Sequence, residues 1–79
     1  MIVRPSALKH GIGEADVQEA AGNALIDGPL DEENPQRRLR LGFDTKTRLL
    51  EIVVLVWDDG TVEIIHAMKC RPQYRALLD

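Results

Sequence analysis

Side chains that can move protons or bind phosphate gather toward the C-terminus of this 79-residue chain. His66 and Lys69 lie in one apolar-rich segment, and Arg71 and Tyr74 follow it. Histidine exchanges protons near neutral pH, whereas lysine and arginine stabilise developing negative charge. These residue types can bind a phosphate, stabilise developing negative charge or exchange protons. In an extended strand, His66 and Lys69 would point to opposite faces unless a bulge intervenes, so if the chemistry is at a phosphate we rank Lys69 and Arg71 as phosphate stabilisers above His66 as the proton-transfer group.

Other kinds of chemistry lack the residues they need. Cys70 is the single cysteine, and with His10 and His66 it makes too small and scattered a set for a zinc site, so we expect no metal and no other cofactor. Ser6 is the only serine and has no base beside it. Lone histidines and solvated arginines are also common in proteins without catalysis, so a structural role stays open for His66 and Arg71.

Charge is divided by region, although the net charge is only -3. Seven carboxylates and no base occur from Glu14 to Glu33. Bases dominate from Asn34 to Leu50 and again from His66 to Leu78. This asymmetry favours a polyanion on one side of a small domain. The same charges would also serve simply to solvate a helix and two strands.

Hydrophobic spacing predicts two helices in the N-terminal part. The stretch from Ala7 to His10 would form a short helix that stops at Gly11. The segment from Gly13 to Leu25 has apolar residues three and four positions apart, with acidic residues in its first turn. Asp27-Gly28-Pro29 would end the helical region, and a polar loop from Asp31 to Gln36 follows.

From Arg37 onward the hydrophobic period becomes two, which predicts strands. The first strand ends at Phe43, the second spans Leu49 to Trp57 with Glu51 as its one charge, and the third spans Thr61 to Lys69. A short helix after Pro72 completes the chain, and Met1 to Arg4 is a candidate for a short fourth strand. We therefore expect one α+β domain over residues 1–79, with two N-terminal helices, a three-stranded antiparallel meander and a short C-terminal helix.

Several short strings, in the order of these elements, resemble one protein family. From about Lys9 to Leu78 the chain is similar to BrnT-like toxins of bacterial type II toxin–antitoxin systems, which belong to the RelE-like group. The strings are Lys9-His10-Gly11-Ile12, Arg38-Leu39-Arg40-Leu41-Gly42, Arg48-Leu49-Leu50, Ile64-Ile65-His66-Ala67-Met68-Lys69 and Arg71 to Tyr74.

The resemblance implies a RelE-like fold and a metal-independent endoribonuclease that cleaves messenger RNA. In such enzymes the ribose 2′-hydroxyl attacks the adjacent phosphate. The implied partner is a cognate antitoxin, commonly a ribbon-helix-helix protein, through which the toxin can oligomerise. The implied catalytic residues are His10, His66, Lys69, Arg71 and Tyr74. The arginines expected to face RNA are Arg37, Arg38, Arg40 and Arg75.

Two alternatives to an enzyme remain. The chain is less basic than typical toxins of this kind, so a non-catalytic module that retains the antitoxin-binding surface fits as well. A small regulatory protein whose sheet edge pairs with a partner strand is the other. The first 30 residues lack signal-peptide features and no apolar run approaches about 18 residues, so we expect a cytoplasmic protein with no membrane partner.

Overall fold

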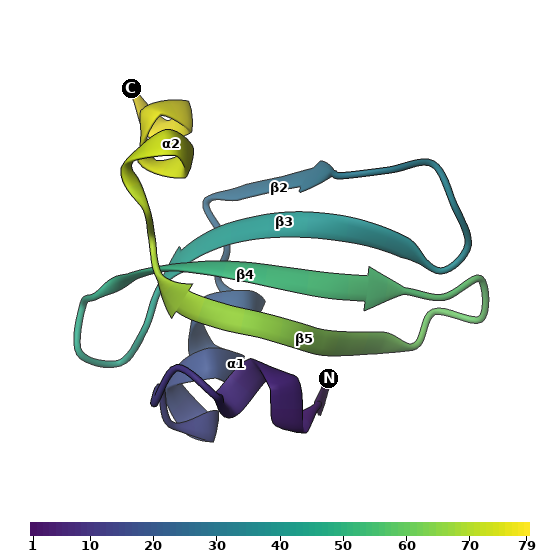
Figure 1. Ribbon diagram of the computed structural model, residues 1–79, viewed down its shortest axis with the longest axis horizontal. Coiled ribbons are helices and arrows are strands. Elements are labelled where there is room, and N and C mark those ends of the chain that lie inside the picture. The colour runs from purple at the N-terminus through teal and green to yellow at the C-terminus, as the bar shows by residue number, and fades with distance from the viewer.

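A computed structural model describes residues 1–79, which form a single mixed sheet with helices on both of its faces. The strands follow the order β1-β5-β4-β3-β2, and all neighbours are antiparallel except β1, which runs parallel to β5 (Figure 1). The elements are β1 (Ile2–Val3), the 3-10 turn η1 (Pro5–Leu8), α1 (Glu14–Gly22), β2 (Ile26–Pro29), β3 (Gln36–Phe43), β4 (Leu49–Val56), β5 (Val62–Lys69), α2 (Pro72–Arg75) and the 3-10 turn η2 (Ala76–Leu78).

The expected RelE-like arrangement of two N-terminal helices and a three-stranded meander is wrong, because the sheet has five strands. The meander of β3, β4 and β5 is present, but β1 and β2 extend it on either side. The segment expected to terminate the helix is β2, in which Gly28 pairs with Leu39 and Pro29 with Arg38. Glycine and proline indicate a break in an isolated sequence, yet an edge strand tolerates a proline because one of its sides has no hydrogen-bonded neighbour.

The N-terminal helices also differ from the expectation. The first is a single 3-10 turn, and His10 lies beyond its end. The second, α1, ends at Gly22 rather than at Leu25. The Leu25 N–H donates to the carbonyl of Leu41 (2.7 Å). The chain therefore leaves the helix early because pairing with β3 takes over the backbone hydrogen bonds.

The main core lies between α1, η1 and one face of the sheet. Leu50, Ile52 and Val54 of β4 pack there against Val17 and other buried residues of the helix. Gly42 of β3 lies under the helix, where a Cβ atom would overlap the carbonyl oxygen of Ala20. A residue without a side chain at this position allows α1 to approach the sheet closely.

A β-bulge in β5 decides which way its polar residues point. Val54 pairs with Ile64 and Val53 pairs with His66, so Ile65 has no partner in β4. In a regular strand, Ile64 and His66 would share a face. Ile64 lies in the α1 core, and the extra residue turns His66 to the opposite face.

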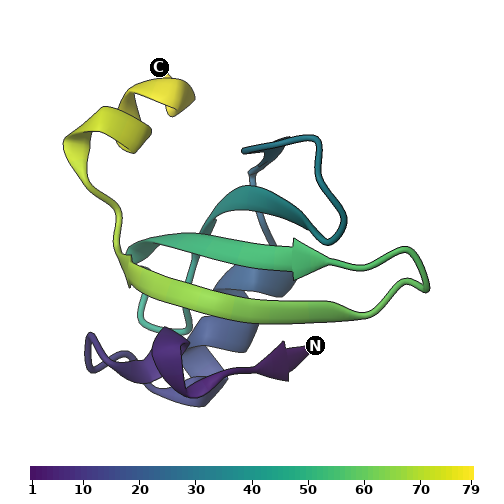
Figure 2. The same cartoon turned by 45° about the vertical axis from the view of Figure 1, so that its right-hand side comes forward.

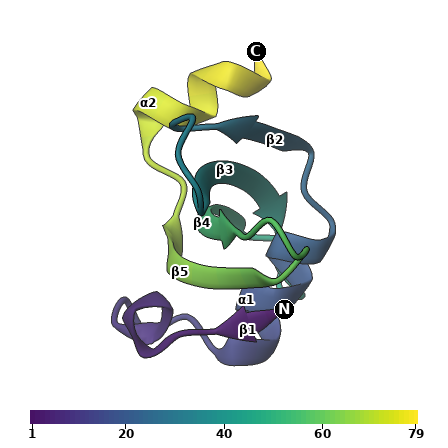
Figure 3. The same ribbon diagram turned by 90° about the vertical axis from the view of Figure 1, so that its right-hand side faces the viewer.

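The face of the sheet away from α1 carries a smaller cluster. Leu39, Leu41 and Cys70 are buried there, and Tyr74 packs against them. Seen from the side, α1 lies below the sheet and α2 lies above it (Figure 3). The segment after β5 leads α2 and η2 away from the strands (Figure 2). None of the helices is long and apolar enough to cross a membrane.

Candidate functional site

A buried carboxylate, Glu51, binds two of the side chains that the sequence singles out. Its side chain is 1% exposed and lies on the face of β4 away from α1. Arg71 donates three hydrogen bonds to it, from the backbone N–H and Nε to Oε1 (2.9 Å each) and from Nη2 to Oε2 (2.8 Å). His66 Nε2 lies 3.1 Å from Oε2. We call Glu51, His66, Arg71, His10 and Tyr74 the Glu51 cluster.

The hydrogen bonds determine the charge state of Glu51. Burial alone would raise the pKa of this carboxyl, but the bonds from the side chain and backbone of Arg71 and from His66 outweigh burial and hold the pKa below its usual value. The bond to Glu51 also raises the pKa of Arg71. Ionised Glu51 can only accept hydrogen bonds, which assigns the proton of neutral His66 to Nε2 and leaves Nδ1 as a proton acceptor.

Two aromatic side chains complete the cluster. The His10 ring meets the His66 ring edge to face, with 5.5 Å between centroids and 78° between planes. The guanidinium carbon of Arg71 lies 5.5 Å from the centre of the Tyr74 ring, a cation–π distance. The Ser6 hydroxyl donates to the carbonyl of Ile65 (2.7 Å) and fastens η1 beside β5. This contact keeps the following residues, including His10, close to His66.

Gly11 turns the chain immediately after His10. Its φ of 82° lies in the left-handed region that glycine adopts without strain, and its N–H donates to the Leu8 carbonyl (3.1 Å). His10 therefore lies in a turn rather than in a helix, and Gly11 directs the chain toward α1. Of the five residues predicted to be catalytic, four meet in the Glu51 cluster.

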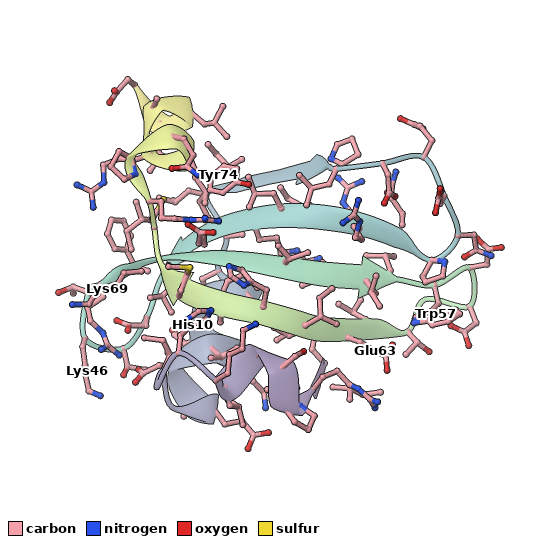
Figure 4. All side chains as sticks on the ribbon, viewed as in Figure 1. His10, Lys46, Trp57, Glu63, Lys69 and Tyr74 are labelled. Carbon is pink, nitrogen blue, oxygen red and sulfur yellow. The ribbon has the colours of Figure 1, made fainter.

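Lys69, the fifth, lies apart from the cluster. It pairs with Leu50, whose side chain is buried in the α1 core, so Lys69 is on the α1 face and His66 is on the other. The bulge precedes His66 and does not bring the two together. Lys69, His10 and Tyr74 nevertheless lie at the same end of the sheet, opposite Trp57 and Glu63 (Figure 4).

The arginines expected to bind RNA on β3 are occupied by carboxylates. Arg37 Nε donates to Asp31 (2.8 Å), and Arg38 Nε donates to Asp27 (2.8 Å). Arg40 approaches Asp27 (3.4 Å), and its Nη1 donates to the Ala21 carbonyl at the end of α1 (3.2 Å). These bonds hold β2 and its loop against β3. Arg75, by contrast, has no ion pair.

A second buried carboxylate, Asp16, lies at the start of α1. It accepts hydrogen bonds from the backbone N–H and the hydroxyl of Thr45 and from Lys46 Nζ (3.2 Å), and Arg48 Nη2 lies 3.4 Å away. The bond from the Thr45 side chain is the main reason that the pKa of Asp16 is lowered. None of these partners exchanges protons near neutral pH. The Asp16 network joins α1 to the turn between β3 and β4.

The hollow that the molecule contains does not lie at the Glu51 cluster, because it is lined by Met1, Ile2, Gly60, Thr61 and Val62. No three side chains of His, Cys, Asp or Glu are grouped so that they could hold a metal ion.

Sequence reasoning missed the residue at the centre of the cluster. Glu51 is the one charge in an otherwise apolar strand, and a buried charge requires partners. That signal indicates a buried ion pair, but it does not identify Arg71, 20 positions away, as the partner. Comparison of the chain with protein-family models, with curated proteins and with solved structures finds no match.

Proposed function

We propose that the protein is a BrnT-like toxin that cleaves RNA without a metal ion, and that the Glu51 cluster is its catalytic site. The observation that carries the proposal is the pair of adjacent imidazoles, His10 and His66, beside the buried Glu51–Arg71 ion pair. Cleavage through the 2′-hydroxyl needs a base, an acid and a cation. The cluster contains groups of all three kinds.

His66 is suited to be the base. Its Nδ1 takes the proton of the ribose 2′-hydroxyl while the 2′-oxygen forms a bond to phosphorus. The imidazolium that results is stabilised by Glu51, which receives a hydrogen bond from the other ring nitrogen. Glu51 does not touch the substrate and is a positioning residue.

The acid acts on the leaving oxygen, opposite the attacking 2′-oxygen, and the cation acts on the other phosphate oxygens. Arg71 uses Nε and Nη2 to bind Glu51 and keeps Nη1 for the oxygens of the pentavalent phosphate. Its side chain is 45% exposed and so is reachable by a polymer. The protonated His10 gives its proton to the departing 5′-oxygen as the phosphorus–oxygen bond breaks. The products are a 2′,3′-cyclic phosphate and a free 5′-hydroxyl.

Single-residue variants test the two imidazoles. His66→Gln and His10→Gln should each lower the rate of cleavage of an end-labelled oligoribonucleotide by about 100-fold or more, because each removes a proton-transfer group. The control is Asp59→Asn, which changes one carboxylate in the turn after β4, at the opposite end of the sheet. Parental rates in both histidine variants would disprove the assignment. The 2′,3′-cyclic phosphate is the product that the chemistry requires.

Metal removal tests the remaining part of the mechanism. Protein treated with a chelator and then dialysed should cleave RNA at the untreated rate, since Arg71 supplies the positive charge. A loss of activity that a divalent cation restores would contradict the metal-free mechanism.

In biological terms, we propose that the protein acts in the cytoplasm and inhibits cell growth. A ribbon-helix-helix antitoxin would neutralise it. Induced expression of the parent should stop growth, and co-expression of an antitoxin encoded next to it should restore growth. His66→Gln should lose toxicity while it still binds the antitoxin.

A non-catalytic interaction module is the second candidate. The observation that favours it is the C-terminal segment, which extends from the sheet and leaves Leu77 55% and Leu78 37% exposed. Exposed leucines on such a segment are typical of a surface that binds another protein. This reading predicts that His66→Gln inhibits growth as strongly as the parent, whereas the enzyme predicts that it does not.

A further inference from the structure

The cations of this protein fall into two groups. Seven of the ten lysines and arginines form ion pairs with carboxylates. The three that form none are Lys9, Lys69 and Arg75. A cation that already neutralises a carboxylate gains less from a phosphate than one that is free, since the existing partner must be given up. Apart from Arg71, whose Nη1 is not used by Glu51, the free cations are therefore the better phosphate ligands.

These three cations are close in the chain to members of the Glu51 cluster, although Lys69 lies on the α1 face of the sheet. Lys9 precedes His10, whose ring lies against His66. Lys69 is the last residue of β5. Arg75 lies one helical turn after Arg71, and its N–H donates to the Arg71 carbonyl (3.0 Å). In the chain the three cations thus stand before, between and after the reactive residues, and Lys69 and His10 lie at the same end of the sheet (Figure 4).

An exposed aromatic ring lies at the same end of the sheet. Phe43 is the last residue of β3, is 46% exposed and pairs with Leu49. The carbonyl of Leu49 accepts the N–H of Cys70 (2.9 Å), so Phe43 lies about 10 Å, or two strand spacings, from the backbone beside Arg71. A free aromatic face near phosphate-binding cations is typical of surfaces that bind single-stranded nucleic acid, because an unpaired base can stack on it.

The opposite end of the sheet carries the reverse charge. Glu32 and Glu33 of the loop before β3 and Asp58 and Asp59 of the turn after β4 form no ion pair, and the Asn34 side chain joins the two loops through Asp58 (2.8 Å). Glu14 and Asp79, both exposed, bound the basic end at the start of α1 and at the C-terminus. A nucleic-acid strand is thus repelled from one end and attracted to the other.

We infer that single-stranded RNA crosses the end of the sheet where β5 ends, with its phosphates on Lys9, Lys69 and Arg75 and one base stacked on Phe43. The inference rests on the proposed function and specifies its substrate. It replaces the three arginines of β3 as the expected RNA contacts, because those arginines are bound to Asp27 and Asp31.

Binding of a 2′-O-methyl oligoribonucleotide tests the inference without any cleavage, because the blocked 2′-oxygen cannot attack. A fluorescent 12-residue strand is titrated with protein at several KCl concentrations. The test variant carries Lys9→Ala, Lys69→Ala and Arg75→Ala. The matched variant carries Arg4→Ala, Arg37→Ala and Arg38→Ala, which changes the net charge equally but at ion-paired arginines. Thermal melts by circular dichroism check that both variants fold.

The negative slope of log affinity against log salt concentration should become shallower by about two in the test variant, since each of three phosphate contacts on a single strand contributes about −0.7. The matched variant should keep most of the parental slope. Phe43→Ala should weaken binding about tenfold, and Phe43→Tyr should restore it. A blunt-ended duplex of the same length should bind less tightly than the single strand.

The outcomes separate the surface from the chemistry. A parent that binds the strand, with loss confined to the test variant, supports the inference even when ordinary RNA is not cut, and that result would refute only the proposed catalysis. Equal losses in the two triple variants would show that net charge alone matters and would overturn the inference. A parent that does not bind the strand would overturn it as well.

Discussion

Glu51 and Asp16 are both buried carboxylates that bind cationic side chains, and they lie on opposite sides of the same sheet. The partners of Asp16 are Lys46 and Arg48, from one turn that follows β3. The partners of Glu51 are Arg71 and His66, and an imidazole is a side chain that can both donate and accept a proton.

The contrast shows that burial and ion pairing do not by themselves mark a catalytic site. Both carboxylates have lowered pKa values for the same kind of reason, hydrogen bonds that favour the charged form. Only Glu51 orients a group that can exchange protons, and only Glu51 has a second imidazole nearby. The chemistry of the partners therefore separates a structural ion pair from a candidate site.

Neutralising each carboxylate in turn should give the largest difference in RNA cleavage rate between the two regions. Glu51→Gln keeps the shape of the side chain but no longer stabilises the His66 imidazolium, so the RNA cleavage rate should fall by about 100-fold. Asp16→Asn should leave the rate per folded molecule at the parental value. Initial rates at 25 °C, corrected for the folded fraction, measure both. Equal rate losses in the two variants would remove the distinction.

Substitution at Gly42 should perturb the Asp16 side of the sheet through packing. Gly42→Ala places a methyl group on the carbonyl of Ala20 and should lower the free energy of unfolding by about 2 kcal/mol. Gly28→Ala is the control, because no atom lies within 4 Å of the added Cβ. Urea unfolding followed by circular dichroism compares the two. A Gly42→Ala protein as stable as the parent would show that α1 can move away from β3 without loss.

Acid should reduce the stabilisation that both buried carboxylates provide. This effect should be smaller than those of the substitutions above. The pKa values of Glu51 and Asp16 in the folded protein lie below their ordinary values of 4.5 and 3.8. Their contributions to stability are complete above the ordinary values and are lost as the pH falls through the lowered ones. Glu51→Gln and Asp16→Asn should each flatten the decline in unfolding free energy as the pH falls below about 5, just above these ordinary values. Parental pH profiles in both variants would contradict this.

Parts of this architecture follow from local patterns. Alternation of apolar and polar residues locates β3, and the apolar run with a following Asp-Gly turn locates β4 and β5. Apolar residues three and four positions apart locate most of α1. The edge strand β2 is different, because its Gly28 and Pro29 resemble a loop until β3 lies beside them. Local propensity carries little information about an edge strand whose hydrogen bonds depend on a distant partner.

For the candidate site, too, one part follows from the sequence and another part follows only from the fold. The sequence by itself determined which residue types are available, since His66, Arg71 and Tyr74 stand close together in the chain and His10 lies in a recognisable string. Strand parity already separates Lys69 from His66, whereas only the tertiary structure decided that Glu51 joins the cluster and that the arginines of β3 are occupied. The reason is that a one-residue bulge reverses the facing of a strand, and ion pairs form between segments whose proximity no local pattern encodes.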